Sequence, residues 1–261
     1  MLSSLNEDTV VYISSFLSKE DRWTLIRRMG NSRLSSLTLK AKVLFSLSQD
    51  CSVRFYKDEM FRQHVQSKVS VDSNQRILIS LSLKDAWDVK EVSALREVHT
   101  LDLSDCDGIT DVSALGRVHT LDLRNCRSIT DVSALGRVHT LNLIGCRGIT
   151  DVSSLGGVHS LRLSFCTGIT DVSALGGVHT LNLSGCSGVT NVNALGGVHT
   201  LDLSDCPGIT DVSALGGVNT LDLSSCQGIT DILLLMLKTF SFSNGIQYSS
   251  LFFKVSQTYQ L

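Results

Sequence analysis

Proline is almost absent from this sequence, which has one in 261 residues. Such a low content disfavours stiff, proline-rich linkers and favours a regularly stacked chain. The most apolar stretch, residues 232–237, is far shorter than the ~20 residues that a helix needs to span a bilayer. The N-terminus has no basic start followed by an apolar run, so we expect no secretory signal. These absences predict a cytoplasmic protein with no membrane partner.

A strong charge of either sign is also lacking, because the net charge is -2 and 18% of the residues are charged. Residues 1–80 carry 12 Lys and Arg against 8 Asp and Glu, a net charge of +4. The remaining residues carry 11 against 17, a net charge of -6. Neither part has the clustered basic stripe that nucleic-acid binding requires, so we expect no nucleic-acid partner. The hydrophobic content of 43% is sufficient for a packed core.

A 20-residue repeat dominates what is present. Residues 98–117 read VHTLDLSDCDGITDVSALGR, and a divergent copy precedes them at residues 78–97. Further copies begin at Val118, Val138, Val158, Val178, Val198 and Val218. Phe240 and Phe242 suggest a degenerate last copy. Below, Val98 and its equivalents are position 1 of the repeat, and each repeat is named by its first residue.

Apolar residues recur at seven positions of each repeat. In the Val98 repeat these are Val98, Leu101, Leu103, Cys106, Ile109, Val112 and Leu115. The alternation around Leu101 predicts a strand, and such strands would stack in parallel ~4.8 Å apart. The rest of the repeat is short for an α-helix, so we expect an extended or 3-10 convex side. Gly108 and Gly116 suit the bends, where we expect positive φ angles.

The pattern L-x-x-L-x-L-x-x-C-x-G-I-T-D resembles the cysteine-containing class of leucine-rich repeats. That class commonly supplies the substrate-binding half of F-box proteins. The V-S-A-L continuation at a 20-residue period resembles the short repeats of internalin-like solenoids instead. Both resemblances imply a solenoid in which each repeat buries its leucines against its neighbours.

Helical periodicity precedes the repeats. Val10, Ile13 and Leu17 predict a first helix, and Ser18 would cap a second helix that contains Leu25. A third helix is expected over residues 34–45 and an amphipathic helix over residues 55–65. The latter would cap the first repeat.

This N-terminal segment resembles an F-box. The matching positions are Leu5, Asp8, Val10, Ile13, Phe16, Leu17, Asp21 and Leu25. Asn6 stands where the F-box motif has proline, and Arg22 stands where an apolar residue is usual. The resemblance implies that Leu5, Ile13, Leu17 and Leu25 contact a Skp-family adaptor protein.

The predicted fold is therefore α+β. Residues 1–47 form a small helical, F-box-like head, and residues 48–77 form a linker and cap helix. Residues 78–237 form a parallel-sheet leucine-rich-repeat solenoid of eight units with a mostly non-helical convex side. Residues 238–261 form a degenerate last repeat and C-terminal cap.

The chemistry-bearing residues are periodic rather than clustered. Seven of the eight cysteines recur every 20 residues, from Cys106 to Cys226. Without a secretory signal we expect free thiols in packing roles. Cys-x-x-Cys pairs and nucleophile, phosphate-binding and dinucleotide motifs are missing, so we expect no metal, no cofactor and no enzymatic activity. The aspartates at position 14, such as Asp111, are expected to form turns or caps.

Six histidines also recur every 20 residues, from His99 to His199, and Asn219 ends the series. A metal-binding or pH-sensing stripe and simple inheritance through repeat duplication both account for this pattern.

Outward strand positions are mostly Asp, Asn or Ser, and the exceptions cluster on three neighbouring repeats. They are Arg124, Ile144, Arg162 and Phe165. Arginine and aromatic residues are typical interface anchors, so we expect these four to bind a protein target on the concave face. Neutral drift between recent duplicates is the alternative.

The F-box resemblance implies a substrate receptor of a Skp–cullin–F-box ubiquitin ligase. The alternative is a plain protein-interaction solenoid, a scaffold or host-factor binder, whose N-terminal helices act only as a cap. Near-identical repeats behind such a head also resemble gene families of large DNA viruses, which implies a location in host cytoplasm.

Overall fold

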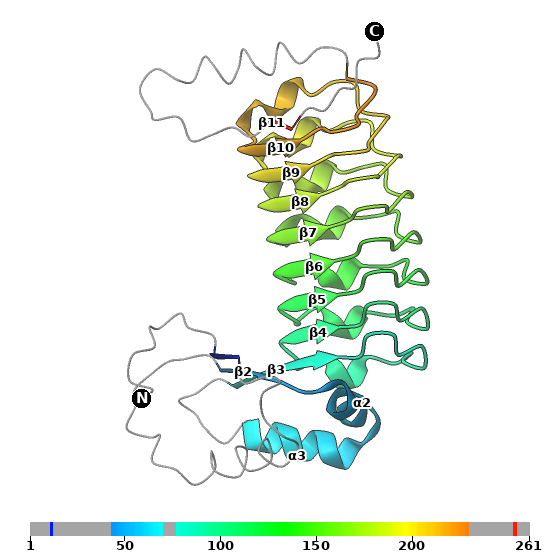
Figure 1. The fold of residues 1–261 in the computed structure, drawn as a ribbon, viewed down its shortest axis with the longest axis vertical. Helices are drawn as coiled ribbons and strands as arrows, with labels where there is room; N and C mark the ends of the chain where they lie inside the picture. The colour runs from blue at the N-terminus through cyan, green and yellow to red at the C-terminus, as the bar shows by residue number, and fades with distance from the viewer. Residues whose placement is uncertain (1–10, 13–42, 70–76, 230–252, 255–261) are drawn as a thin grey trace, which may run out of the picture. The chain divides into compact units, whose positions relative to one another are not determined.

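The computed structural model describes residues 11–12, 43–69, 77–229 and 253–254. The chain divides into two compact units. The first consists of Met1–Leu83 and Glu97–Asp102, and the second consists of Lys84–Arg96 and Leu103–Leu261. Parallel strands occur in both units (Figure 1).

In its described residues the first unit has four parallel strands and two helices. In order of pairing the strands are β1 (Val11–Tyr12), β2 (Val43–Ser46), β3 (Ile77–Ser82) and β4 (Thr100–Asp102). The helices α2 (Gln49–Lys57) and α3 (Glu59–Val69) lie between β2 and β3 in the sequence.

Two helices thus replace the single helix that was predicted over residues 55–65. The helical conformation is interrupted at Asp58, between α2 and α3. The Asp58 carboxylate accepts a hydrogen bond from the Phe61 N–H at 3.0 Å and so caps the start of α3. Helix α2 lies against the strand of the first repeat, because the Ser52 hydroxyl accepts a hydrogen bond from the Ser82 N–H at 3.2 Å.

The predicted helical head is wrong at two places. Val11–Tyr12 is a strand where the first helix was expected, and Val43–Ser46 is a strand where the third helix was expected to end. Both segments are rich in β-branched and aromatic residues, which favour strands once a neighbouring strand is available for pairing. The candidate adaptor-binding residues Leu5, Ile13, Leu17 and Leu25 lie outside the described residues.

The second unit is a stack of 20-residue repeats with one short strand each. The strands are β5 (Thr120–Asp122), β6 (Thr140–Asn142), β7 (Ser160–Arg162), β8 (Thr180–Asn182), β9 (Thr200–Asp202), β10 (Thr220–Asp222) and β11 (Phe253–Lys254). They pair in parallel in this order, and from β5 to β10 equivalent residues face each other, for example Leu141 and Leu161. The predicted strands centred on the position-4 leucines are therefore present.

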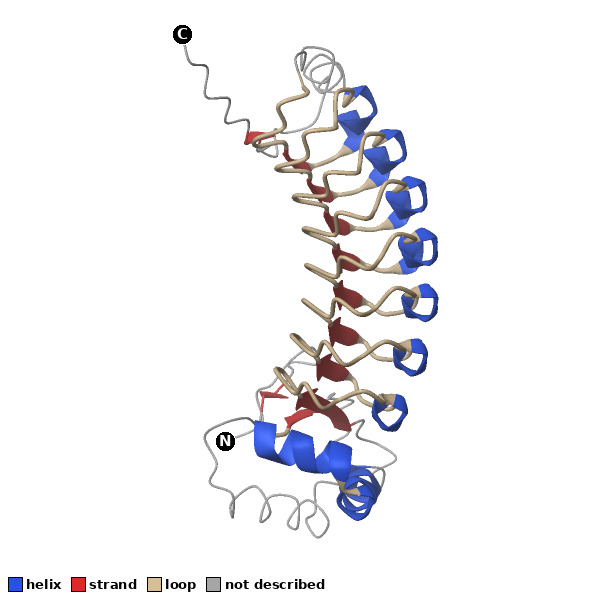
Figure 2. Ribbon diagram, turned by 90° about the vertical axis from the view of Figure 1, so that its right-hand side faces the viewer, coloured by secondary structure: helices blue, strands red, loops and turns tan. Residues whose placement is uncertain are grey.

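The return path of each repeat is a 3-10 helix, as expected. These helices are η2 (Ser93–Leu95), η3 (Ser113–Leu115), η4 (Ser133–Leu135), η5 (Ser153–Gly157), η6 (Ser173–Gly177), η7 (Asn193–Gly197) and η8 (Ser213–Gly217). In the second unit they form one side of the stack, and the strands form the other side (Figure 2). Positions 3 to 10, which comprise the strand and the turn that follows it, are called the strand face below.

The core of the second unit is formed by the seven predicted apolar positions. In the Val138 repeat these are Val138, Leu141, Leu143, Cys146, Ile149, Val152 and Leu155. Each is at most 1% exposed, although one repeat alone is too thin to bury them. Stability therefore comes from the interfaces between adjacent repeats.

The expected role of the glycines was wrong. Gly108 and Gly116 are not among the residues with positive φ, and Gly116 has a φ of -62°. A Cβ atom at Gly108 would lie 2.9 Å from the Val89 carbonyl oxygen, and one at Gly116 would clash with the Ala134 carbonyl oxygen. These glycines permit close approach between adjacent repeats rather than an unusual backbone angle.

The C-terminal end also differs from the expectation. The strand that pairs with β10 is Phe253–Lys254, with Phe253 opposite Leu221. Phe240 and Phe242, which suggested the last repeat, lie outside the described residues.

Candidate protein-binding face

Polar side chains on the strand face of the second unit bond to one another across repeats. Asn142 donates a hydrogen bond to Asp122 at 3.1 Å, and Asn182 donates one to Asp202 at 2.7 Å. The Ser164 hydroxyl donates to the Asn182 side-chain oxygen at 2.5 Å. Most of this face is thus internally satisfied, so side chains that lack such partners are the better candidates for binding.

Position 8 of every repeat adopts a left-handed backbone conformation. The non-glycine residues with positive φ are Asp85, Asp105, Asn125, Phe165, Asp205 and Ser225, and the glycines are Gly145 and Gly185. Asp, Asn and Gly are the residues that tolerate this region best, whereas a bulky side chain there is an outlier. Phe165, with a φ of 61°, is therefore held in an unfavourable conformation.

The Phe165 ring has room because the next repeat has a glycine, Gly185, at the equivalent position. A Cβ atom added to Gly185 would lie 2.5 Å from Cδ1 and 2.7 Å from Cε1 of Phe165. The ring therefore occupies the space above the Gly185 backbone that a side chain would otherwise fill. Phe165 is nevertheless 52% exposed, so about half of it remains available to a partner.

The other three predicted target-binding residues occupy neighbouring repeats. Arg124 and Ile144 are both at position 7, and the Asn125 N–H donates to the Ile144 carbonyl at 2.8 Å. The Arg124 guanidinium lies 3.4 Å from the Asp122 carboxylate, with 43% of its side chain exposed. Ile144 is half-buried.

The side chain of Arg162, at the end of β7, is exposed and makes no hydrogen bond or ion pair with any residue in the described ranges. It faces Asn142 on one side and Asn182 on the other. The structure therefore brings the four residues onto one face over three repeats. It corrects the expected strand positions of three of them, because β5, β6 and β7 end at Asp122, Asn142 and Arg162. The turns that follow these strands contain Arg124, Ile144 and Phe165.

The cysteine ladder, Cys106 to Cys226 at position 9, is buried beneath the turns and its thiols are free. From Cys126 onward, each thiol donates to the carbonyl of the position-6 leucine in the preceding repeat. For example, Cys146 Sγ lies 3.0 Å from the Leu123 oxygen. Burial raises the pKa of the Cys126 thiol to about 12, which keeps it protonated and able to donate. A structural role for this position follows.

Histidines at position 2 form a second ladder at an exposed edge. From His119 to His199 the imidazole rings stack in sequence, with centroids 4.6 to 4.7 Å apart. Each Nδ1 lies within hydrogen-bond distance of the next residue's hydroxyl where that residue is threonine, as at His139 with 3.2 Å to Thr140. Desolvation in the stack lowers the pKa of His179, and repulsion from His199 and His159 lowers it further.

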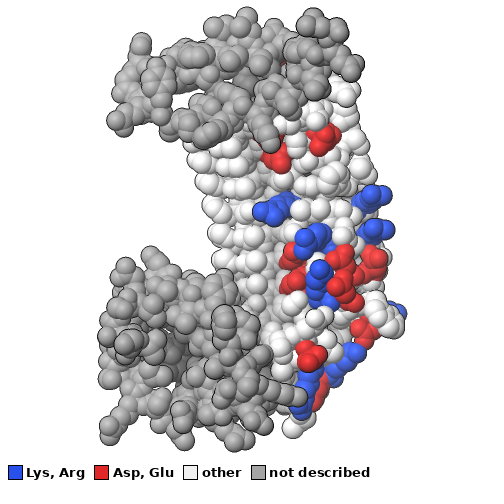
Figure 3. Space-filling model, in the orientation of Figure 1, with Lys and Arg blue, Asp and Glu red and all other residues white. Residues whose placement is uncertain are grey.

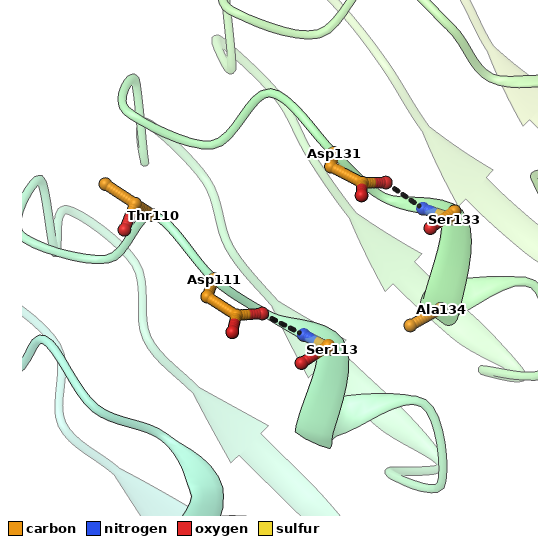
Figure 4. A pocket seen from close by; sticks show the side chains of 6 residues that line it. All are labelled: Thr110, Asp111, Ser113, Asp131, Ser133 and Ala134. Atoms are coloured by element: carbon orange, nitrogen blue, oxygen red, sulfur yellow. Dashed lines mark hydrogen bonds between the residues drawn. The ribbon is translucent and has the colours of Figure 1, made fainter.

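The aspartates at position 14 cap the 3-10 helices, as the sequence predicted. Asp111 and Asp131 accept hydrogen bonds from the Ser113 and Ser133 N–H groups at 2.8 Å (Figure 4). The Ser133 N–H lowers the pKa of Asp131. These side chains line a shallow depression between adjacent 3-10 helices.

Two findings concern other kinds of site. Within the described ranges, no three or more His, Cys, Asp or Glu side chains are arranged to hold a metal ion. Across that same part of the chain, no helix combines the length and apolar character needed to cross a membrane.

Comparison with known proteins supports the repeat assignment. The family model described as "Leucine Rich repeat" matches residues 96–115. A search of curated protein sequences finds no match.

Solved structures with similarity include internalins from Listeria monocytogenes. An internalin C2 is 23% identical over 67% of this chain and 80% of its own, with a TM-score of 0.48. An internalin described as inlF is 20% identical over 58% and 53% of the two chains, with a TM-score of 0.37. The functional domain of InlJ, described as including a cysteine ladder, is 18% identical over 62% and 50%, with a TM-score of 0.29. The family match and the stacked 20-residue units together show that this chain carries leucine-rich repeats.

Proposed function

We propose that this chain binds another protein through Arg124, Ile144, Arg162 and Phe165 on the strand face, and that it has no catalytic role. Solenoids offer extended surfaces of this kind to their partners. Phe165 is the observation that carries the proposal. It keeps a half-exposed aromatic ring at a left-handed position where Asp, Asn or Gly would be less strained.

The proposal is tested by truncating two of the anchors. Phe165→Ala combined with Arg162→Ala should weaken binding of a purified partner at least about 30-fold, which corresponds to ~2 kcal/mol for loss of an interface anchor. Ser184→Ala combined with Ser204→Ala is the matched control on the next two repeats and should leave affinity unchanged. Equal affinity of the parent and the Phe165/Arg162 variant would mean that these residues arose by neutral drift between duplicated repeats and do not bind the partner.

For the N-terminal segment, the finer proposal is an F-box-like role. The chain would then be a substrate receptor of a Skp–cullin–F-box ubiquitin ligase and would bind a Skp-family adaptor through Leu5, Ile13, Leu17 and Leu25. The sequence resemblance supports this proposal. Strand β1 at Val11–Tyr12 weighs against it, because an F-box implies helix there.

One experiment distinguishes the adaptor-binding role from the alternative of a plain protein-interaction solenoid. Full-length chain is incubated with purified Skp-family adaptor, and retention is compared with that of a Leu17→Asp variant. Adaptor binding that Leu17→Asp abolishes, while the far-ultraviolet circular dichroism spectrum is retained, supports the receptor role. No binding by the parent chain would leave the protein-binding solenoid as the function and remove the ubiquitin-ligase role.

A further inference from the structure

Positive charge on the strand face of the second unit is concentrated in three repeats, and single lysines stand apart from them at Lys84 and Lys254. In the Val118, Val138 and Val158 repeats, this face carries four cations and one acidic residue. They are Arg124, Arg127, Arg147, Arg162 and Asp122. The face therefore has a net charge of +3 over these repeats.

The repeats on either side carry the opposite charge. Toward the N-terminal end of the second unit lie Asp105 and Asp107, and residues 163–229 contain no Lys or Arg at all. In residues 163–229 the charged residues on the strand face are Asp202, Asp205 and Asp222, and Lys254 in β11 faces Asp222. Figure 3 shows Lys and Arg side chains over the middle of the visible face and again toward its lower end, whereas the charged side chains drawn nearer β10 are acidic.

The cationic part of the face is also where its apolar groups lie. Ile144 and the exposed half of Phe165 belong to the same three repeats as the four arginines. Arg127 and Arg147, both at position 10, are exposed in the turns beside this patch. Only Arg124 among the four is in an ion pair within the described residues.

We infer that the partner docks here through a short acidic segment that also carries an aromatic or large apolar side chain. This inference rests on the proposed function and adds Arg127 and Arg147 to the binding surface. The acidic side chains of the segment meet the arginines, while its apolar side chain covers Phe165 and Ile144. Cation–carboxylate pairs of this kind give register and specificity, and the apolar contact excludes water.

The flanking aspartates limit the length of the acidic segment. Three stacked strands span ~10 Å, which corresponds to roughly three or four residues of extended chain. A longer polyanion, such as a nucleic acid, would lie over Asp202 and Asp222 and be repelled. The charge pattern therefore favours a compact acidic and aromatic motif in a protein over a long uniform polyanion.

The inference is tested with a fluorescein-labelled peptide that has glutamates on both sides of one tryptophan. Fluorescence anisotropy titrations should show binding to the parent chain that weakens as salt is raised. Replacement of the glutamates by glutamine, or of the tryptophan by alanine, should weaken it. Single-stranded oligothymidine and heparin should bind less tightly than the peptide at equal salt.

Matched charge variants locate the site. Arg127→Gln with Arg147→Gln should weaken peptide binding about fivefold, in line with the loss of two exposed charge pairs. Arg117→Gln with Arg137→Gln removes the same charge at position 20, outside the strand face, and should have little effect. Equal losses for the two pairs, tighter binding of heparin or oligothymidine, or no peptide binding would overturn the inference. A purified partner could lose affinity for the Phe165/Arg162 variant and keep full affinity for the Arg127/Arg147 variant. That result would reject the acidic motif but would leave the proposed function standing.

Discussion

Replacing Phe165 by glycine and by alanine separates the strain at this position from the contacts of the ring. Both substitutions remove the ring and its contact with Gly185. They differ in the Cβ atom, which alanine retains and glycine lacks. At a φ of 61° this single atom decides which variant is more stable.

The expected difference follows from two opposing terms. A Cβ atom in the left-handed region costs about 1–2 kcal/mol. Glycine loses more backbone entropy on folding than alanine, which costs about 0.5–1 kcal/mol. The glycine variant should therefore be more stable than the alanine variant by about 0.5–1 kcal/mol, which reverses the usual order of these residues.

Urea unfolding followed by circular dichroism at pH 7.5 measures this difference. The same two substitutions at Ser184, which has no positive φ, provide the control and should favour alanine. An alanine variant of Phe165 as stable as the glycine variant would refute the left-handed assignment and the argument from strain. Glycine at 165 that preserves stability but lowers partner affinity would show that the strained ring serves binding.

Four further outcomes are expected. In the native protein a thiol-reactive aromatic disulfide should modify the partly buried Cys51 faster than the seven buried ladder thiols, such as Cys126, which should react only after addition of denaturant. Because the pKa of His179 is lowered, the folded chain binds fewer protons than the unfolded chain at pH values just below the ordinary pKa of 6.5. The urea concentration at the unfolding midpoint should therefore fall as the pH drops from 7.5 to 5.5. This fall should be smaller in the His179→Asn variant. Asp131→Ala should destabilise the protein and Asp131→Asn should not, because Asn191 already caps its 3-10 helix at 3.0 Å. The lowered pKa of Asp131 favours folding above its ordinary value of 3.8, and this stabilisation should be lost as pH falls through the folded-state pKa, as pH-dependent unfolding of parent and Asp131→Asn would show.

The repeats were predictable because their apolar residues keep one phase over eight copies. Inward positions such as Leu141 and Cys146 could be assigned from the 20-residue period alone, and the short return path favoured a 3-10 helix. The stacking of the histidines required the structure, because it depends on the ring orientation as well as the period.

The turn after each strand was the main feature missed. Asp, Asn and Gly at position 8 in six of the eight repeats signal a left-handed residue, but the alternation of the strand was extended through it. Arg124, Ile144 and Phe165 were therefore assigned to strands. At the N-terminal end, the residue types of Val11 and Tyr12 are compatible with a helix and with a strand. Pairing with β2 selects the strand, and the local sequence carries no information about that pairing.

Site-specific photo-crosslinking tests the central claim that the strand face of the Val118, Val138 and Val158 repeats is the binding surface. A photoreactive phenylalanine analogue is placed at Phe165, and in a second protein at Ser173, which is exposed on the 3-10 side of the same repeat. The account predicts that a purified partner is crosslinked from position 165, that excess unlabelled parent chain competes, and that position 173 gives no product. Equal crosslinking from both positions, or crosslinking from position 173 alone, would contradict it.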